Sequence, residues 1–253
     1  MSIHSSVTNG VARIAISRPE KKNALTAAMY QQLAEAIAAA EADHAVRCLL
    51  ICGTPDAFTA GNDLEEFARH PPNSADAPVF RFMAALRDAE KPVVAAVTGV
   101  AVGIGTTLLL HCDLVYAADT ARFSMPFVSL GLCSEFASSF LLPLRAGHSR
   151  AAEKLLLAEP FDAADALELR IVTRVLPAAE VLTYAQTRAE RFSALPPNSV
   201  RTTKRLMKHA HRRVVEEVMA MEIEHFAQLL RSGEAKEAFA AFFERRPADF
   251  SRF

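Results

Sequence analysis

Apolar and polar positions in the first part of the chain follow the strand period and the helix period in turn. Residues 11–17 (VARIAIS) alternate, which predicts a strand that ends at Arg18-Pro19. Residues 26–42 carry apolar residues at helical spacing behind Thr26, a residue type that caps helices, so we expect a helix there. Residues 46–52 are almost continuously apolar, which is typical of a parallel strand covered on both faces.

The alternation of strands and helices continues to about residue 178 and then gives way to helical spacing alone. The further elements that we expect are a helix beginning near Asp63, a helix at residues 80–89, a strand at 92–97, a short helix ending near Cys112, a strand at 113–118, and helices capped by Ser149 and Asp162. This order predicts an α/β fold, with a core over residues 1–195 and a helical C-terminal region over residues 196–253.

One apolar segment has a second interpretation. Residues 93–110 form a run of 18 uncharged residues, which is long enough for a marginal membrane span. Glycines and threonines interrupt its middle, so a buried strand, a glycine turn and a buried helix explain it better. The N-terminus has no basic stretch followed by an apolar one. We therefore expect a cytoplasmic protein without a signal peptide or a membrane partner.

Composition narrows the possible partners. A chain of 253 residues buries enough surface to fold without a disulfide or a metal ion, and its formal charge of −1 gives no bias toward nucleic acid or membranes. The four cysteines, Cys48, Cys52, Cys112 and Cys133, lie among apolar residues. Because no His or acidic residue is near Cys48 or Cys52, we expect reduced core thiols and no metal site.

Two glycine turns are the first candidates for chemistry. Gly61 precedes the helix expected at Asp63, and a second turn runs from Gly99 to Gly105. A helix N-terminus leaves backbone N–H groups unpaired, so two turns that converge on one point would stabilise an enolate oxygen. Taken singly, either one is more simply a tight turn that binds nothing. The second lacks the G-x-G-x-x-G spacing of a dinucleotide site.

Four segments follow one another in an order that is specific when they are taken together. They are RPEKKNAL, AFTAGNDLEEF, KPVVAAVTGVAVGIGTTLLLHCDLVYAADTARF and AEPFDAADALELRIVTRVLP. This pattern resembles the crotonase (enoyl-CoA hydratase/isomerase) family over nearly the whole chain. The resemblance implies an α/β fold of the ClpP/crotonase type, with repeated ββα units and a helical C-terminal trimerisation region, and hence a homotrimer or homohexamer. Arg170 stands where the family commonly has Gly, so we expect the helix C-terminus there either to carry left-handed strain of about 1 kcal/mol or to end differently.

The resemblance also implies which residues meet an acyl-CoA substrate. The N–H groups of Asn62 and Ile104 would form an oxyanion hole. The residues implied to bind the coenzyme are Lys21, Lys22, Ala60, Asp63, Leu64, Phe242 and Arg245, the last two often supplied by a neighbouring subunit. Packing within a helix explains Phe242 equally well. Coenzyme A is part of the substrate, so no separate cofactor is implied.

The reaction depends on carboxylates. Hydratases that resemble this chain hold a water with two glutamates, and Thr107 and Phe127 stand at those positions. A different acid, Glu135, lies in the apolar segment PFVSLGLCSEFASSFLLP, and apolar surroundings raise the pKa of a carboxyl group. The segment resembles that of Δ3,Δ2-enoyl-CoA isomerases, in which the matching glutamate shuttles a proton. Without that resemblance, an exposed glutamate in a first helical turn is the simpler explanation.

We therefore expect an acyl-CoA enzyme that stabilises a thioester enolate, with isomerase chemistry favoured. A hydratase that uses Glu135 alone and a non-enzymatic binding protein of the same fold are the alternatives. The acyl pocket would be formed by Thr107, Phe127 and Leu132; with Ile104, their bulk favours short or medium aliphatic chains.

One further feature, a basic helix face, is not explained by the acyl-CoA site. Arg201, Lys204, Lys208 and Arg212 recur at spacings of three and four residues. A solvated face is the simplest interpretation, and contact with coenzyme phosphates is the second. Nucleic-acid binding is disfavoured because no aromatic residues interleave with these bases.

Overall fold

The computed structural model describes residues 2–72, 74 and 76–253. Its strands are β1 (Ile3–Thr8), β2 (Val11–Ile16), β3 (Cys48–Cys52), β4 (Ala57–Thr59), β5 (Val93–Val97), β6 (Val100–Val102), β7 (Leu114–Ala118), β8 (Arg122–Ser124), β9 (Phe161–Asp162) and β10 (Arg174–Leu176). Its α-helices are α1 (Ala27–Ala42), α2 (Leu64–Arg69), α3 (Pro78–Asp88), α4 (Ile104–Thr107), α5 (Ser138–Ala146), α6 (His148–Leu156), α7 (Ala163–Glu168), α8 (Val181–Glu190), α9 (Pro197–His209), α10 (Arg212–Leu229) and α11 (Gly233–Glu244).

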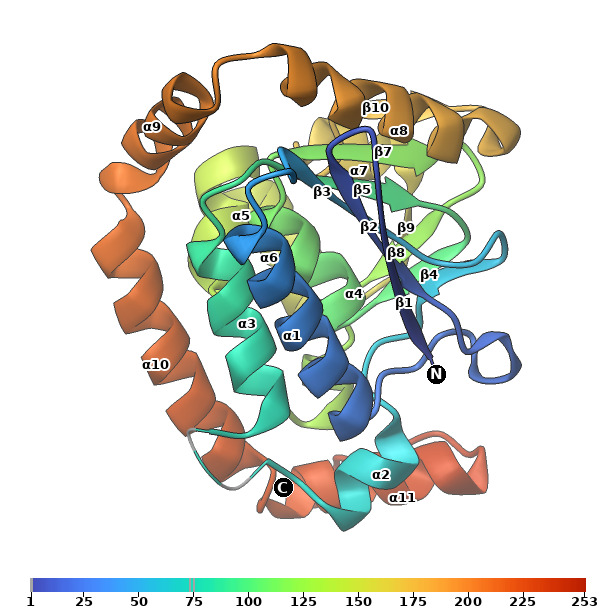
Figure 1. Cartoon of the computed structure of the whole chain (residues 1–253). Coiled ribbons are helices and arrows are strands. Elements are labelled where there is room, and N and C mark those ends of the chain that lie inside the picture. Colours follow the sequence, from blue (N-terminus) through green and yellow to red (C-terminus); the bar gives the residue numbers. More distant parts are fainter. Residues whose placement is uncertain (1, 73, 75) are drawn as a thin grey trace.

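The larger sheet has the strand order β1-β2-β3-β5-β7-β10 within the described residues. β1 pairs antiparallel with β2, and the other neighbours are parallel. Every residue of β3 and β5 is buried, which confirms that these apolar runs are central parallel strands. Helix α8 packs on β2, β3, β5 and β7, while α1 packs on β1, β2 and α3 (Figure 1).

The smaller sheet, β4-β6-β8-β9, carries the two glycine turns. β4 and β6 are parallel neighbours, and each leads through a glycine to the N-terminus of a short helix, α2 after Gly61 and α4 after Gly103. The prediction of one turn over residues 99–105 was wrong, because β6 lies within it. A strand of three residues is too short to give a recognisable period. The parallel pairing brings both helix N-termini to one edge of the sheet.

The C-terminal helices wrap around the core. Figure 1 shows α9 and α10 along one side of the molecule and α11 beneath it, beside α2. α11 also packs on the segment before Glu135, because a Cβ on Gly131 would lie 2.6 Å from the backbone nitrogen of Ala235. The C-terminal region therefore covers the core of its own chain. A domain boundary at residue 195 stays a prediction.

Local signals at the element ends were mostly correct. Thr26, Asp63 and Asp162 cap α1, α2 and α7 by accepting backbone N–H groups. Ser149 does not cap α6, because that helix begins one residue earlier, at His148. Arg170 has a φ of 57°, which is the first of the two alternatives for this helix end, a left-handed backbone.

Strand β1 was not predicted. Only Ile3 in it is buried, so an edge strand of this kind shows no clear alternation. The membrane alternative for residues 93–110 is not supported by the helices, since none in the described part of the chain is long and apolar enough to cross a bilayer.

Candidate active site

The two glycine turns lie directly against each other. A Cβ on Gly61 would be 2.6 Å from the carbonyl oxygen of Val102 and 3.9 Å from the Cα of Gly103. Gly61 has a φ of 83° and Gly103 a φ of 56°, in the region that side chains other than glycine's rarely allow. The first residues after these glycines, Asn62 and Ile104, are therefore brought to the same place.

The backbone N–H groups of Asn62 and Ile104 remain available. Leu25 pairs with the residues on either side of Asn62: its N–H donates to Gly61 O at 2.7 Å, and its carbonyl accepts from the Asp63 N–H at 2.9 Å. No hydrogen bond among the described residues uses the N–H of Asn62 or of Ile104, which begins α4. Ile104 is not among the residues with positive φ, so its side chain causes no left-handed strain.

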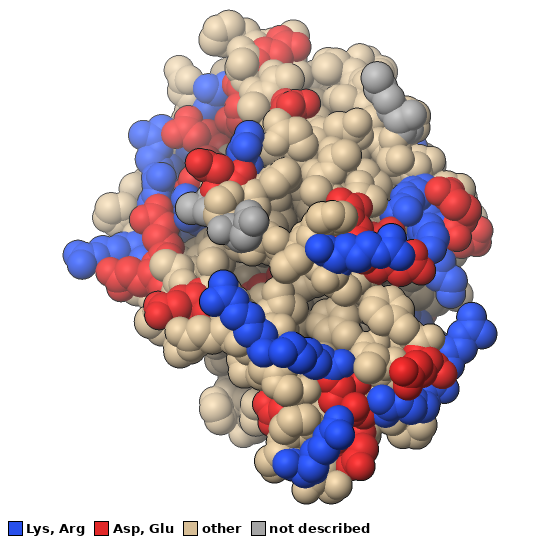
Figure 2. Space-filling view, turned by 90° about the horizontal axis from the view of Figure 1, so that it is seen from below, with Lys and Arg blue, Asp and Glu red and all other residues tan. Residues whose placement is uncertain are grey.

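Both turns open into one pocket of about 700 Å³, a size that suits a small-molecule ligand. Asn62 and Ile104 lie in its wall, together with residues of α2 and α11. Figure 2 shows the face that these two helices form: uncharged atoms surround a hollow, and Lys, Arg, Asp and Glu side chains gather along its border. A ligand with an apolar part and charged groups at its outer end would match this distribution.

Most of the predicted binding residues line this pocket. They are Lys21, Ala60, Asp63, Leu64, Phe127, Leu132 and Phe242. Phe242 lies against the pocket of its own chain, and its side chain is 55% exposed. The residues Lys22, Arg245 and Thr107 do not line it. Thr107 is fully buried, and Arg245 adopts a left-handed backbone just beyond α11, so the next residue, Arg246, lines the pocket instead.

Asp63 is held by Arg18, which no sequence motif identified. Arg18 Nη1 donates to Asp63 Oδ2 at 2.7 Å, and Asp63 Oδ1 accepts the N–H of Glu66 at 3.2 Å. Burial works to raise the pKa of Asp63, but the hydrogen bonds from Arg18 and Glu66 outweigh it, so the pKa is lowered. Asp63 is thus a fixed negative charge that ties the first glycine turn to the segment after β2.

Glu135 is buried. Its side chain is 7% exposed, and Oε1 has no hydrogen-bond partner among the described residues. Burial, and then the charge of Glu222, raise its pKa to about 8. The alternative of an exposed glutamate in the first turn of a helix is wrong, because α5 begins only at Ser138. A carboxyl group with such a pKa can accept and return a proton near neutral pH.

Tyr30 interacts both with the first glycine turn and with Glu135. Its hydroxyl donates to Asn62 Oδ1 at 2.5 Å. Burial, and then the nearby charge of Glu135, raise the pKa of Tyr30, so the phenol stays neutral. Glu135 itself is not among the residues that line the 700 Å³ pocket. Tyr30 could not be found from the sequence, because its only signal there is a place in the apolar stripe of α1.

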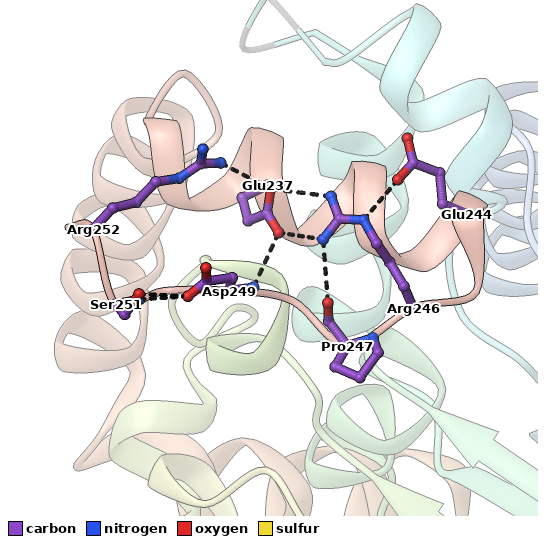
Figure 3. Close-up of polar contacts among 7 residues, drawn as sticks. All are labelled: Glu237, Glu244, Arg246, Pro247, Asp249, Ser251 and Arg252. Atoms are coloured by element: carbon purple, nitrogen blue, oxygen red, sulfur yellow. Dashed lines mark hydrogen bonds and ion pairs between the residues drawn. The ribbon is translucent and has the colours of Figure 1, made fainter.

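The C-terminal tail folds back on α11 beside the pocket (Figure 3). The carboxylate of Glu237 accepts from Arg246 Nη2 at 3.2 Å, from the Asp249 N–H at 3.0 Å and from Arg252 Nη2 at 2.9 Å. The Arg246 hydrogen bond, followed by that of Asp249, lowers the pKa of Glu237 to about 2. This network orients Arg246, which lines the pocket.

The basic helix face is not simply solvated. Lys204 is buried, and its Nζ donates to Asp113 Oδ2 and to the carbonyl oxygen of Lys91, both at 2.7 Å. Burial lowers the pKa of Lys208 to about 8. This face therefore anchors α9 to the core, because a buried ammonium group needs such partners. It lies apart from the glycine-turn pocket, whose lining includes neither lysine.

The prediction that the four cysteines lie in the core is only partly correct. Cys48, Cys52 and Cys112 are buried, whereas Cys133 is half-buried. No three His, Cys, Asp or Glu side chains of the described residues are grouped in a way that would hold a metal ion.

Comparisons with known proteins show the family to which this chain belongs. The family profile described as "Enoyl-CoA hydratase/isomerase" matches residues 6–252. Enoyl-CoA delta isomerase 2 of Rattus norvegicus is 35% identical over 94% of this chain, but this chain spans only 62% of that protein's length. The 1,2-epoxyphenylacetyl-CoA isomerase of Escherichia coli K12 is 32% identical, with 98% of both chains covered.

Solved structures extend the match to the whole fold. The structure of Pseudomonas aeruginosa OdaA is 47% identical, with a TM-score of 0.94 over 96% of this chain and 99% of that one. A crystal structure of an enoyl-CoA hydratase/isomerase from Pseudoalteromonas atlantica is 41% identical, with a TM-score of 0.94 over 99% of this chain and 100% of that one. With its fold, its paired glycine turns and the profile match over residues 6–252, this chain belongs to the crotonase family of enoyl-CoA hydratases and isomerases.

Proposed function

We propose that this chain is a Δ3,Δ2-enoyl-CoA isomerase, which moves the double bond of an enoyl-CoA from C3–C4 to C2–C3. The observation that carries the proposal is Glu135, a buried carboxyl group with a pKa of about 8, whose Oε1 has no hydrogen-bond partner in the described part of the chain. The positions of the two hydratase glutamates are occupied by Thr107 and Phe127, which cannot activate a water. One carboxyl group is enough for an isomerase, because the same proton is removed and returned.

In the proposed mechanism, the thioester carbonyl accepts hydrogen bonds from the N–H groups of Asn62 and Ile104. These donors acidify the C2 hydrogen, and the Glu135 carboxylate removes it as a proton. The electron pair of the C–H bond forms a dienolate whose oxygen the two N–H groups stabilise. Protonated Glu135 then returns the proton to C4, which leaves the double bond between C2 and C3 and restores the carboxylate.

The coenzyme part of the substrate would occupy the outer end of the pocket. Lys21 and Arg246 line the pocket, and charge-assisted hydrogen bonds from such groups bind phosphates strongly. The half-exposed ring of Phe242 offers a surface on which an adenine can stack. This assignment replaces the predicted Arg245 with Arg246. The cytoplasmic location, the homotrimer or homohexamer and the preference for short or medium acyl chains stay predictions.

Hydration is the rival reaction, and the names of some relatives support it. Among the relatives at about 31% identity are proteins named probable enoyl-CoA hydratase, for example that of Mycobacterium leprae. A hydratase that uses Glu135 alone would add water to crotonyl-CoA and give a 3-hydroxyacyl-CoA. A binding protein of this fold would turn over neither substrate.

The test is incubation with trans-3-hexenoyl-CoA, in which 2-enoyl-CoA is followed by absorbance and the products by mass spectrometry. The proposal predicts 2-hexenoyl-CoA from the wild type and a loss of several orders of magnitude in Glu135→Gln. Hydration of crotonyl-CoA by a wild type that is inert toward trans-3-hexenoyl-CoA would refute the isomerase and favour the hydratase. No reaction with either substrate or with other acyl-CoA thioesters would favour the binding protein.

A further inference from the structure

The backbone directly after Glu135 is strained. Phe136 and Ala137 have φ values of 58° and 53°, a left-handed conformation that costs free energy for residues with a side chain. Two such residues in succession persist only where their surroundings hold them. The direction in which Glu135 projects therefore depends on the groups that hold residues 136–139.

Two side chains from elsewhere in the sequence hold this segment. His111 Nε2 lies 2.8 Å from the carbonyl oxygen of Phe136, and the two rings stack with their centroids 3.8 Å apart. Glu222, on α10, accepts hydrogen bonds from Ala137 and Ser139. Its Oε2 accepts the Ala137 N–H at 2.5 Å, and its Oε1 accepts the Ser139 N–H at 3.1 Å and the Ser139 hydroxyl at 2.6 Å.

Glu222 also contributes a charge. It is 7% exposed, and although burial raises its pKa, the three donors favour its ionised form. The three donors favour the carboxylate form of Glu222, whereas Glu135 Oε1 has no donor among the described residues.

Three other titratable groups of this region, Tyr30, Cys133 and His111, are neutral at pH 7. Burial raises the pKa of Tyr30 on α1 above its usual value and that of Cys133 to about 11. Burial lowers the pKa of His111 to about 3, so its ring is neutral and carries one hydrogen. That hydrogen lies on Nε2, because the Phe136 carbonyl oxygen beside Nε2 can only accept a hydrogen bond. Among the described residues, Glu222 is the charged group that acts on Glu135 to raise its pKa.

We propose that Glu222 is a positioning residue for Glu135: its carboxylate fixes the strained backbone that carries Glu135 and keeps a negative charge beside that side chain. This inference rests on the proposed function, in which Glu135 shuttles the proton. Both carboxylate oxygens of Glu222 accept hydrogen bonds from Ala137 and Ser139, so it acts through the segment that carries Glu135 and not through the substrate. The C-terminal helix α10 thereby becomes part of the catalytic apparatus.

The test compares Glu222→Gln with the wild type by two readouts. The first is the pH dependence of kcat/KM for trans-3-hexenoyl-CoA, and the second is the titration of the Glu135 carboxyl carbon by 13C NMR, assigned with Glu135→Gln. Removing a nearby like charge favours the ionised form of Glu135, so both midpoints should move to lower pH by about one pH unit. kcat at the plateau should fall about tenfold with KM unchanged, since only the position of Glu135 is altered.

Three control variants separate charge from structure. Glu222→Asp keeps the charge but shortens the side chain, so kcat should fall while the midpoint stays near that of the wild type. Ser139→Ala removes one donor and should also leave the midpoint in place. Glu224→Gln removes an exposed charge from the same helix and should change neither quantity.

Unchanged midpoints and kcat in Glu222→Gln would overturn the inference. So would a shift of the same size in Ser139→Ala, which would show that the effect is only structural. If Glu222→Gln does not fold, the same conclusion is drawn from Glu222→Asp, for which an unchanged kcat counts against the inference. The NMR titration reports on Glu135 even if the wild type fails to isomerise the substrate, so a failure of the proposed function is distinguished from a failure of this inference.

Discussion

Gly61 lies so close to Val102 that a Cβ on Gly61 would be 2.6 Å from the Val102 carbonyl oxygen. This contact joins the turn before α2 to the end of β6, and so it sets the separation of the Asn62 and Ile104 N–H groups. An oxyanion hole depends on that separation, because its donors must reach one oxygen at about 2.7–3.1 Å. The geometry of the oxyanion hole therefore depends on the absence of a side chain at Gly61.

Gly61→Ala should lower kcat about 100-fold or more, because the added methyl group pushes the two turns apart. The measurement is steady-state turnover of trans-3-hexenoyl-CoA. The control is Gly147→Ala, which has a similar φ of 85° but no atom within 4 Å of the added Cβ. It should lose some stability and keep its activity. Equal activity losses in the two variants would mean that backbone strain, and not the collision with Val102, is responsible.

Glu135→Gln should stabilise the protein while it removes activity. The pKa of Glu135 is about 8 in the folded state and about 4.3 in the unfolded chain. Since the raised pKa favours the protonated form, its contribution to stability is complete below about pH 4 and is lost as the pH rises to about 8. Glu135→Gln has no carboxyl group to ionise, so its stability does not fall in this way. Its free energy of unfolding should therefore exceed that of the wild type by an amount that grows over this pH range to a few kcal/mol. Urea unfolding at pH 5 and pH 8.5 measures it, and an advantage independent of pH would contradict the assigned pKa.

Lys204→Ala should destabilise the fold. It leaves Asp113 and the Lys91 carbonyl without the buried ammonium group that contacts both. Removing one partner of a fully buried pair costs about 3–5 kcal/mol, and because Asp113 is 24% exposed we expect about 2 kcal/mol or more. Urea unfolding gives the value. Arg213→Ala, which removes an exposed pair with Glu217, is the control and should leave the urea midpoint where it is.

Glu237→Gln should loosen the C-terminal tail and raise KM for acyl-CoA, because Arg246 loses its orienting partner. The pKa of Glu237 is lowered to about 2, so its contribution is present above about pH 4.3 and is lost as the pH falls through about 2. Hydrogen exchange of residues 246–252 at pH 7 should be faster in the variant than in the wild type. Glu244→Gln, which removes the exposed second partner of Arg246, should have the smaller effect; equal effects would argue against a special role of Glu237.

Several features could be predicted from the sequence because they depend on neighbours along the chain. Thr26 and Asp162 were recognised as helix caps, and a helix start was expected near Asp63, since a cap contacts residues two or three positions later. The continuous apolar runs of β3 and β5 identified central parallel strands. The resemblance of the glycine turns and of the segment around Glu135 named Asn62, Ile104 and Glu135 as candidates. The structure has a buried carboxyl group at Glu135, and the N–H groups of Asn62 and Ile104 have no partner within the described ranges.

The partners of these residues were decided by the tertiary structure alone. Glu222 contacts Ala137 across 85 positions of sequence, and Arg18 contacts Asp63 across 45. No local period reports such contacts, because they depend on how α10 and the segment after β2 pack against the core. The same holds for the exposure of a side chain: Lys204 belongs to a basic stripe in the sequence, but packing buries it. The sequence by itself determined which chemical groups this protein has and the broad alternation of its helices and strands, but not β1 or the short strand β6. The packing of distant segments determined which groups are buried, paired and charged, because the electrostatic energy of an ionisable group depends on everything that surrounds it.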